Sequence, residues 1–171
     1  EYSPLSAAIL AEVMHDSGVP AGVFNMVYGD GQTVGAAISA HPDIDCVSFT
    51  GSTRAGIDVA RSAAPTVKRV VQELGGKSPN IILPSADLAK AVKDGIKGLM
   101  MNSGQSCSAP SRMLVPKARI EEVKTAVIET MEKVLPGSPD SGAYVGPVVN
   151  EKQYKSIQAY IQSGIDEGAT V

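Results

Sequence analysis

The 171-residue chain contains no tryptophan and has only two phenylalanines and five tyrosines. So few aromatic rings argue against a platform on which nucleic-acid bases stack. The net charge of −3 likewise provides no cationic surface for a polyanion. No apolar run approaches the roughly 18 residues of a spanning helix, and no signal segment opens the chain. The composition therefore predicts neither a nucleic-acid partner nor a membrane partner.

Cysteine and histidine are also scarce. The two cysteines, Cys46 and Cys107, lie far apart, which is not typical of a disulfide scaffold. Cys46 alternates with Val47 and Phe49 in an apolar run, so we expect a packed thiol there. The two histidines stand alone, and no cluster has metal-ligand spacing. We predict a reducing compartment, the cytoplasm, and no metal site.

Apolar periodicity indicates helices that alternate with strands. Helices are predicted near residues 3–18, 34–41, 52–64, 87–100, 120–134 and 150–168, and strands near residues 23–27, 46–50, 67–74, 80–83 and 113–115. The apolar stripes of the helices are expected to be core faces, with Ser3, Asp87 and Asn150 as N-caps. This alternation predicts an α/β protein with a mainly parallel sheet and helices on both faces. Gly75-Gly76 is the predicted domain boundary, because it places two strands in succession.

The stretch Met101–Ser111 carries Cys107 among small polar residues. A cysteine that fills a core normally has apolar neighbours, because a free thiol packs as a small hydrophobe. Here Gly104 and Gln105 precede it, and they offer close backbone approach and hydrogen bonds. A reactive thiol and a structural cysteine in a loop both remain open at this point.

A second candidate is the predicted strand-to-helix turn that begins at Gly51. This glycine would let a ligand approach the backbone, and Ser52 and Thr53 supply hydroxyl groups. The following helix offers free N–H groups and the positive end of its dipole, which suits a phosphate. The pattern is neither the dinucleotide nor the P-loop motif. An ordinary helix cap is the alternative interpretation.

Glu73 is the third candidate, because it ends a predicted strand directly before two glycines. The carboxyl ends of parallel strands are where α/β sheets bind ligands. A carboxylate buried there would suit general-base catalysis. The alternative is a surface glutamate at a strand end.

Together, three stretches resemble the NAD(P)-dependent aldehyde dehydrogenase superfamily: Phe49-Thr50-Gly51-Ser52-Thr53, Glu73-Leu74-Gly75-Gly76-Lys77-Ser78-Pro79-Asn80 and Gly104-Gln105-Ser106-Cys107. The second resembles the family's glutamate signature, and the third its cysteine signature. Weaker similarity extends over nearly the whole chain, including Gly146-Pro147 and Glu1-Tyr2-Ser3-Pro4-Leu5. The order and separation of the motifs favour a catalytic Cys107 over a structural one.

The resemblance implies an incomplete aldehyde-dehydrogenase-like, Rossmann-like fold. Residues 1–74 would form the C-terminal part of the coenzyme-binding domain, and residues 75–171 the N-terminal part of the catalytic domain. The chain is then expected to be an internal fragment, inactive alone, of a parent that forms a homodimer or homotetramer.

The resemblance also implies a mechanism. Cys107 would attack an aldehyde to form a thiohemiacetal, and after hydride transfer Glu73 would activate the water that hydrolyses the thioester to a carboxylic acid. The implied coenzyme residues are Glu1, Gly51, Ser52, Thr53, Gly56 and Leu74. A carboxylate at Glu1 favours NAD, with NADP as the alternative. A CoA-acylating enzyme and a non-catalytic nucleotide-binding or scaffold fragment are the rival predictions.

Overall fold

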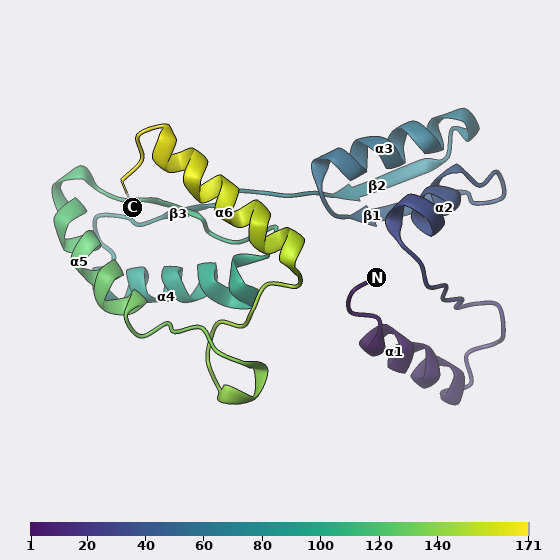
Figure 1. Cartoon of the computed structure of the whole chain (residues 1–171), viewed down its shortest axis with the longest axis horizontal. Coiled ribbons are helices and arrows are strands. Elements are labelled where there is room, and N and C mark those ends of the chain that lie inside the picture. Colours follow the sequence, from purple (N-terminus) through teal and green to yellow (C-terminus); the bar gives the residue numbers. More distant parts are fainter. Residues whose placement is uncertain (171) are drawn as a thin grey trace. The chain divides into compact units, whose positions relative to one another are not determined.

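The computed structural model describes residues 1–170 and divides the chain into two compact units, Glu1–Leu74 and Gly75–Val171 (Figure 1). The assignment of these units to a coenzyme-binding and a catalytic domain stays a prediction. No helix within residues 1–170 combines the length and the apolar character needed to cross a membrane.

The first unit is built around one pair of parallel strands. Its elements are α1 (Leu5–Asp16), a π-helical turn (Gly31–Gly35), α2 (Ala36–Ala40), β1 (Cys46–Thr50), α3 (Thr53–Ala63), a 3-10 turn (Ala64–Thr66) and β2 (Arg69–Glu73). The register of β1 and β2 runs from Cys46 opposite Arg69 to Thr50 opposite Glu73.

The second unit also contains a parallel pair, β3 with β4. Its elements are β3 (Pro79–Ile81), α4 (Leu88–Met100), β4 (Arg112–Leu114), α5 (Ile120–Met131) and α6 (Glu151–Asp166), with 3-10 turns at Met101–Gly104, Lys117–Arg119 and Pro139–Ser141. Parallel strands joined through helices confirm the predicted α/β class.

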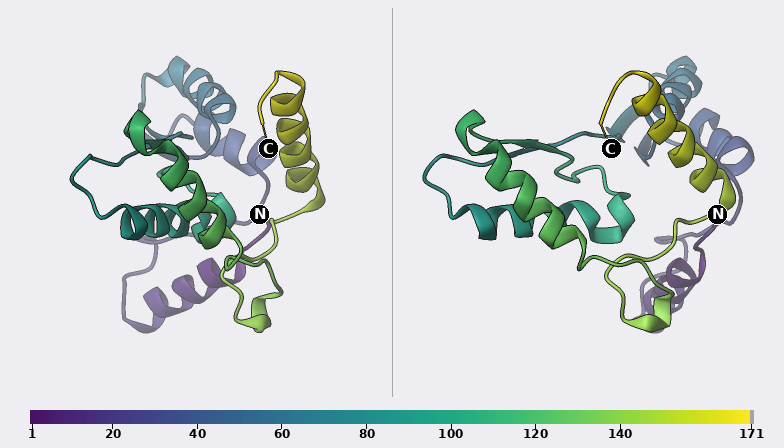
Figure 2. Two further views of the ribbon diagram at one scale, coloured as in Figure 1. Left: turned by 90° about the vertical axis from the view of Figure 1, so that its left-hand side faces the viewer. Right: turned by 60° about the vertical axis from the view of Figure 1, so that its left-hand side comes forward.

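The core of the second unit forms where α4 packs against α5 (Figures 1 and 2). Leu88, Val92 and Ile96 recur every fourth residue, so they lie on one face of α4. Ile82 and Val123 complete the buried cluster, and Val92 is fully buried. The periodicity of α4 therefore predicted its packing correctly.

Two of the three predicted N-caps are confirmed. The carboxylate of Asp87 accepts a hydrogen bond from the Lys90 backbone N–H at 3.2 Å, and the side chain of Asn150 accepts one from Gln153 at 2.9 Å. The prediction for Ser3 is wrong. Pro4 is the N-cap of α1 and already has helical dihedral angles, which leaves Ser3 one residue too early to cap.

Two predicted strand positions are also wrong. Residues 23–27 form no strand, and within residues 1–170 no strand pairs with them. An apolar run without a pairing partner cannot satisfy its backbone groups as a sheet would. The strand predicted at residues 67–74 is β2, which begins at Arg69 and not at Val67, because Val67 has a left-handed backbone conformation with φ of 54°.

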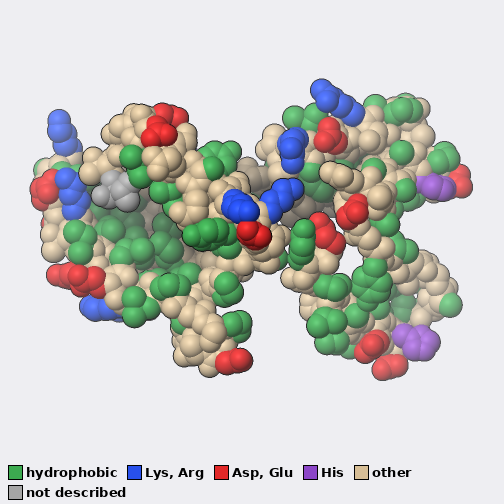
Figure 3. Space-filling model, viewed as in Figure 1, with side chains coloured by type: hydrophobic (Ala, Val, Ile, Leu, Met, Phe, Trp, Pro, Cys, Tyr) green, Lys and Arg blue, Asp and Glu red, His purple; other side chains and the backbone are tan. Residues whose placement is uncertain are grey.

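The apolar stripes of α1 and α6 are not core faces among the described residues, since neither helix has a buried residue. Leu5 of α1 is 78% exposed, and hydrophobic side chains lie at the surface over α1 (Figure 3). Cys46 is exposed too, which corrects the prediction of a packed thiol. The side chains of β1 alternate, so Val47 faces the core and Cys46 the opposite side.

Candidate active site

The carboxyl ends of β1 and β2 bring Glu73 next to the turn that begins at Gly51. The backbone N–H of Gly51 donates to the carbonyl oxygen of Glu73 at 3.0 Å. The sequence therefore placed Glu73 correctly at the carboxyl end of a parallel strand. Its side chain is exposed, however, whereas the general-base interpretation assumed a buried carboxylate. The alternation along β2 puts Glu73 on the same exposed side as Arg69 and Val71.

The turn after β1 has clear structural roles. The hydroxyl of Ser52 accepts a hydrogen bond from the Ala55 N–H at 3.2 Å, so Ser52 is the N-cap of α3 and Thr53 is its first residue. A Cβ atom at Gly51 would lie 2.5 Å from the ring of Phe49, so a larger residue there would displace the ring. The cap interpretation is confirmed, and contact with a coenzyme phosphate stays a prediction.

Gly56 and Leu74 pack against each other in the same unit. A Cβ atom at Gly56 would lie 2.7 Å from the Leu74 side chain, and the Gly56 carbonyl accepts a hydrogen bond from the Gln72 amide at 2.5 Å. Glycine at this position therefore lets α3 approach β2 closely. Coenzyme contact through either residue stays a prediction.

A cavity of about 890 Å³ lies in the first unit. It is lined by Glu1, Asp30, Gly31, Gln32, Gly35, Ala36, Ile38, Ser39, Val47, Ser48, Phe49, Arg54, Ala55, Asp58, Val59 and Ser62. Of the six coenzyme residues predicted from the sequence, this cavity includes Glu1 and omits the other five. Gly29-Asp30-Gly31 has the composition of a turn, which by itself does not indicate a ligand site. A short glycine-rich turn next to a strand-end motif was the signal that could have identified this wall.

Asp30 shapes that wall. Its carboxylate accepts hydrogen bonds from the N–H of Thr33 at 2.7 Å and from the Thr33 hydroxyl at 2.8 Å. The hydroxyl bond is the main reason why the pKa of Asp30 lies below its ordinary value. Asp30 therefore caps the turn at Gly31–Gly35 as a carboxylate.

The loop that carries Cys107 has an unusual backbone. Asn102, Ser103 and Gly104 follow one another in the left-handed region, with φ of 52°, 57° and 74°. Each of the two non-glycine residues costs roughly 1–3 kcal/mol in such a conformation. The side-chain amide of Asn102 donates to the backbone carbonyl of Gln105 at 3.2 Å, and the side-chain amide of Gln105 donates to the backbone carbonyl of Asn102 at 3.0 Å. These two hydrogen bonds hold the loop in place. Backbone strain of this kind is concentrated at functional sites.

Cys107 is a free, exposed thiol, so it does not fill a core. The glutamate signature lies against its backbone, because a Cβ atom at Gly76 would lie 2.6 Å from the Cys107 carbonyl oxygen. Arg112 in β4 holds the residues after Gly76. Its guanidinium donates to the Lys77 carbonyl at 2.7 Å, and its backbone N–H donates to the Ser78 carbonyl at 3.3 Å. The structure therefore brings two of the three motifs together within the second unit. Glu73 belongs to the first unit, and its pairing with the thiol stays a prediction.

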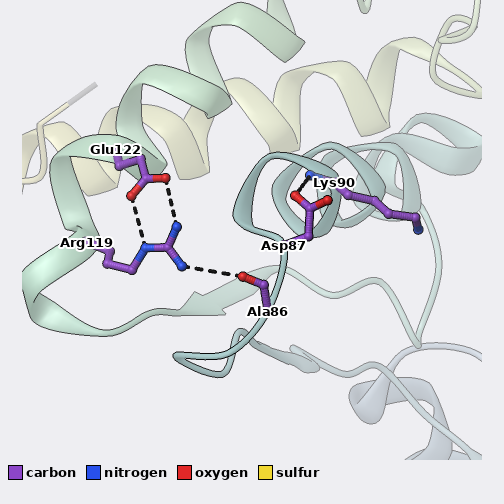
Figure 4. A network of polar contacts seen from close by, with 5 residues as sticks. All are labelled: Ala86, Asp87, Lys90, Arg119 and Glu122. Carbon is purple, nitrogen blue, oxygen red and sulfur yellow. Dashed lines mark hydrogen bonds and ion pairs between the residues drawn. The ribbon is translucent and has the colours of Figure 1, made fainter.

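Polar contacts fix the start of α4, the helix that leads into the Cys107 loop (Figure 4). Arg119 donates to both carboxylate oxygens of Glu122, at 2.8 and 3.0 Å, and to the Ala86 carbonyl at 3.4 Å. The hydrogen bond from Arg119 is the main cause that holds the pKa of Glu122 below its ordinary value. Across residues 1–170, no group of three or more His, Cys, Asp or Glu side chains could hold a metal ion.

Comparison with known proteins agrees with these motifs. The aldehyde dehydrogenase family model matches residues 1–171. A 3-succinoylsemialdehyde-pyridine dehydrogenase from a Pseudomonas species is 52% identical over 170 residues, which is 99% of this chain and 36% of that protein. The putative aldehyde dehydrogenase DhaS of Bacillus subtilis is 42% identical over 170 residues, 99% of this chain and 34% of that protein. The chain thus spans about a third of the length of the curated relatives it matches.

Solved structures are similar as well. A cysteine-to-alanine mutant of aldehyde dehydrogenase C from Pseudomonas syringae, in complex with NAD+ and octanal, superposes with a TM-score of 0.94 at 54% identity, covering 98% of this chain and 35% of that one. Betaine aldehyde dehydrogenase from Staphylococcus aureus, in complex with NAD+, gives 0.93 at 36% identity, covering 98% and 34%. These similarities bear out the predicted fold. The chain belongs to the aldehyde dehydrogenase family.

Proposed function

We propose that this chain carries the reacting groups of an enzyme that oxidises an aldehyde to a carboxylic acid with NAD. The observation that supports this most strongly is the contact of Gly76 with the Cys107 carbonyl, because it holds the glutamate signature against the cysteine loop. Glu73 precedes Gly76 by three residues, and we propose that this short link lets its carboxylate reach the Cys107 loop.

Cys107 is the proposed nucleophile. As a thiolate it adds to the aldehyde carbonyl, and its own backbone N–H is a candidate donor to the oxyanion. Loss of a hydride from the resulting thiohemiacetal leaves a thioester on the sulfur. Glu73 then removes a proton from the water that hydrolyses this thioester, which releases the acid and restores the thiol. NAD, when bound, supplies the acceptor for the hydride.

The first unit has features that fit a dinucleotide. Its cavity of about 890 Å³ is within the range of ligand sites, and Glu1 in the wall could accept hydrogen bonds from ribose hydroxyls. The N-terminus of α3, at Gly51 to Thr53, offers N–H groups to the pyrophosphate. Gly56 and Leu74, which pack against each other, are the remaining proposed coenzyme residues of this unit.

The charges of the cavity favour NAD over NADP. Glu1, Asp30 and Asp58 contribute carboxylates to its wall, against one cation, Arg54. A 2′-phosphate would meet net repulsion there. The similar structures from Pseudomonas syringae and Staphylococcus aureus were both solved with NAD+.

The compartment and the oligomeric state of the parent protein are also proposals based on the family. We propose a cytoplasmic homodimer or homotetramer. Both cysteines, Cys46 and Cys107, are free, which suits a reducing compartment. Because the chain spans about a third of its relatives, we expect the 171-residue piece alone to have little dehydrogenase activity.

The full-length protein containing these residues tests the proposal, with octanal as substrate and NADH absorbance as the readout. Cys107→Ala should lower turnover by at least about a thousandfold. Cys46→Ala removes the other exposed thiol and should leave turnover unchanged. Full activity in Cys107→Ala would contradict the proposal. A product that forms only with added CoA would contradict hydrolysis and favour acyl transfer.

A further inference from the structure

A second cavity, of about 360 Å³, is an open pocket on the second unit, lined partly by exposed side chains, and includes neither Cys107 nor its loop. Its lining residues are Lys93, Lys97, Thr130, Lys133, Val134 and Tyr144. They come from α4, from the C-terminal end of α5 with the residues after it, and from the segment between α5 and α6. Three elements therefore converge on a site that the proposed dehydrogenase chemistry does not use.

The charge of this lining has one sign. Three of its side chains are lysines, and none is an aspartate or a glutamate. Within the part of the chain that the structure describes, none of the three lysines forms an ion pair. The nearby carboxylate of Asp94 does not line the cavity and is bound to Lys90 at 2.7 Å, although the charges of Lys97 and Lys93 also help to lower the pKa of Asp94. The cations are therefore available to an anion that enters from solvent.

The same lining also presents apolar surface. Lysine side chains carry four-carbon stems, Val134 is aliphatic and Tyr144 contributes a ring. The Tyr144 hydroxyl donates to the Lys97 carbonyl at 2.9 Å, which attaches the ring to α4 and uses its polar end. An inorganic anion would match the ammonium groups but would leave this surface without a partner. A carboxylate with a short apolar tail matches both.

We propose that this cavity is a binding site for a small organic carboxylate with an apolar tail, separate from the Cys107 site. The proposal stands apart from the dehydrogenase function, because it uses no residue assigned to that chemistry.

Titration calorimetry with octanoate as the probe tests it in the full-length protein. Each of Lys93→Gln, Lys97→Gln and Lys133→Gln should weaken binding about two- to fivefold, and the triple variant more than tenfold. Rising salt should weaken binding as well. Lys90→Gln is the matched control on the same helix and should bind like the parent. Cys107→Ala should also bind like the parent. Octanoate is also the acid that the proposed reaction would form from octanal, so any binding that the triple lysine variant retains is assigned to the proposed active site.

Two further ligands test the chemistry. Acetate, which lacks the tail, and octanamide, which lacks the charge, should both bind at least tenfold more weakly than octanoate. Equal binding of either ligand, no octanoate binding, or equal loss in Lys90→Gln would overturn the proposal. Lys97 lies in the last turn of α4, so the melting temperature of its variant is measured beside the binding.

Discussion

Gly76 and Cys107 are in direct backbone contact: a Cβ atom at Gly76 would lie 2.6 Å from the Cys107 carbonyl oxygen. The glutamate and cysteine signatures, which are separated along the chain, therefore meet through main-chain atoms. A backbone contact of this kind admits no side chain, which explains why the signature has glycine here.

Gly76→Ala should disturb this contact. The added methyl group must displace the Cys107 backbone, which we expect to cost about 1–3 kcal/mol of unfolding free energy and to lower kcat at least tenfold in the full-length protein. Urea denaturation and steady-state kinetics measure the two effects. Gly75→Ala is the matched control, because a Cβ atom there would meet nothing within 4 Å. If the two variants behaved alike, the contact would have no importance.

The strained residue before β2 offers a test of the fold. Val67 has φ of 54° and is 90% exposed, so it stores backbone strain without compensating burial. Val67→Asn should stabilise the protein by about 1 kcal/mol, because asparagine tolerates the left-handed region better than a β-branched residue. Thermal unfolding measures this shift. Val67→Ile keeps the branched Cβ and should change nothing. A loss of stability in Val67→Asn would show that the turn does not adopt this conformation.

Local signals in the sequence predicted local structure well. The caps Asp87 and Asn150 and the buried face of α4 depend on residues only three or four positions apart, which a sequence displays directly. The strand at residues 23–27 failed because a strand also needs a partner, which no local pattern reveals. The stripe of α1 predicted an apolar face but could not say what packs against it, and no residue of the helix is buried among residues 1–170.

The sequence predicted some features of the candidate site and not others. The positions of Glu73 at a strand end and of Cys107 in a polar loop follow from sequence and from resemblance to the family. The left-handed conformation of Ser103 is stabilised by a distant contact, in which its hydroxyl donates to the Gly146 carbonyl at 2.8 Å. Gly31 could not be predicted as a cavity residue, because a turn motif alone does not show on which side a cavity lies.

The Arg119–Glu122 pair predicts a pH dependence. The pKa of Glu122 is lowered in the folded protein, so the pair contributes stability above the carboxyl's ordinary value of 4.5 and loses it as the pH falls through the folded value. Glu122→Gln should therefore be less stable than the parent at pH 7, and the difference should shrink as the pH falls below 4.5. Urea denaturation across this range measures it. Glu129→Gln is a control on the same helix, because it removes a carboxylate for which the described residues show no ion pair, and a constant deficit in Glu122→Gln would contradict the prediction.

The role of Glu73 is the central claim, and pre-steady-state NADH formation in full-length Glu73→Gln tests it most directly. If Glu73 activates the hydrolytic water, the first turnover should still release NADH as a burst, while later turnovers slow at least a hundredfold because the thioester on Cys107 persists. Glu122→Gln should keep both phases. A Glu73→Gln protein that lost its burst while its steady rate kept pace with the first turnover would contradict this account.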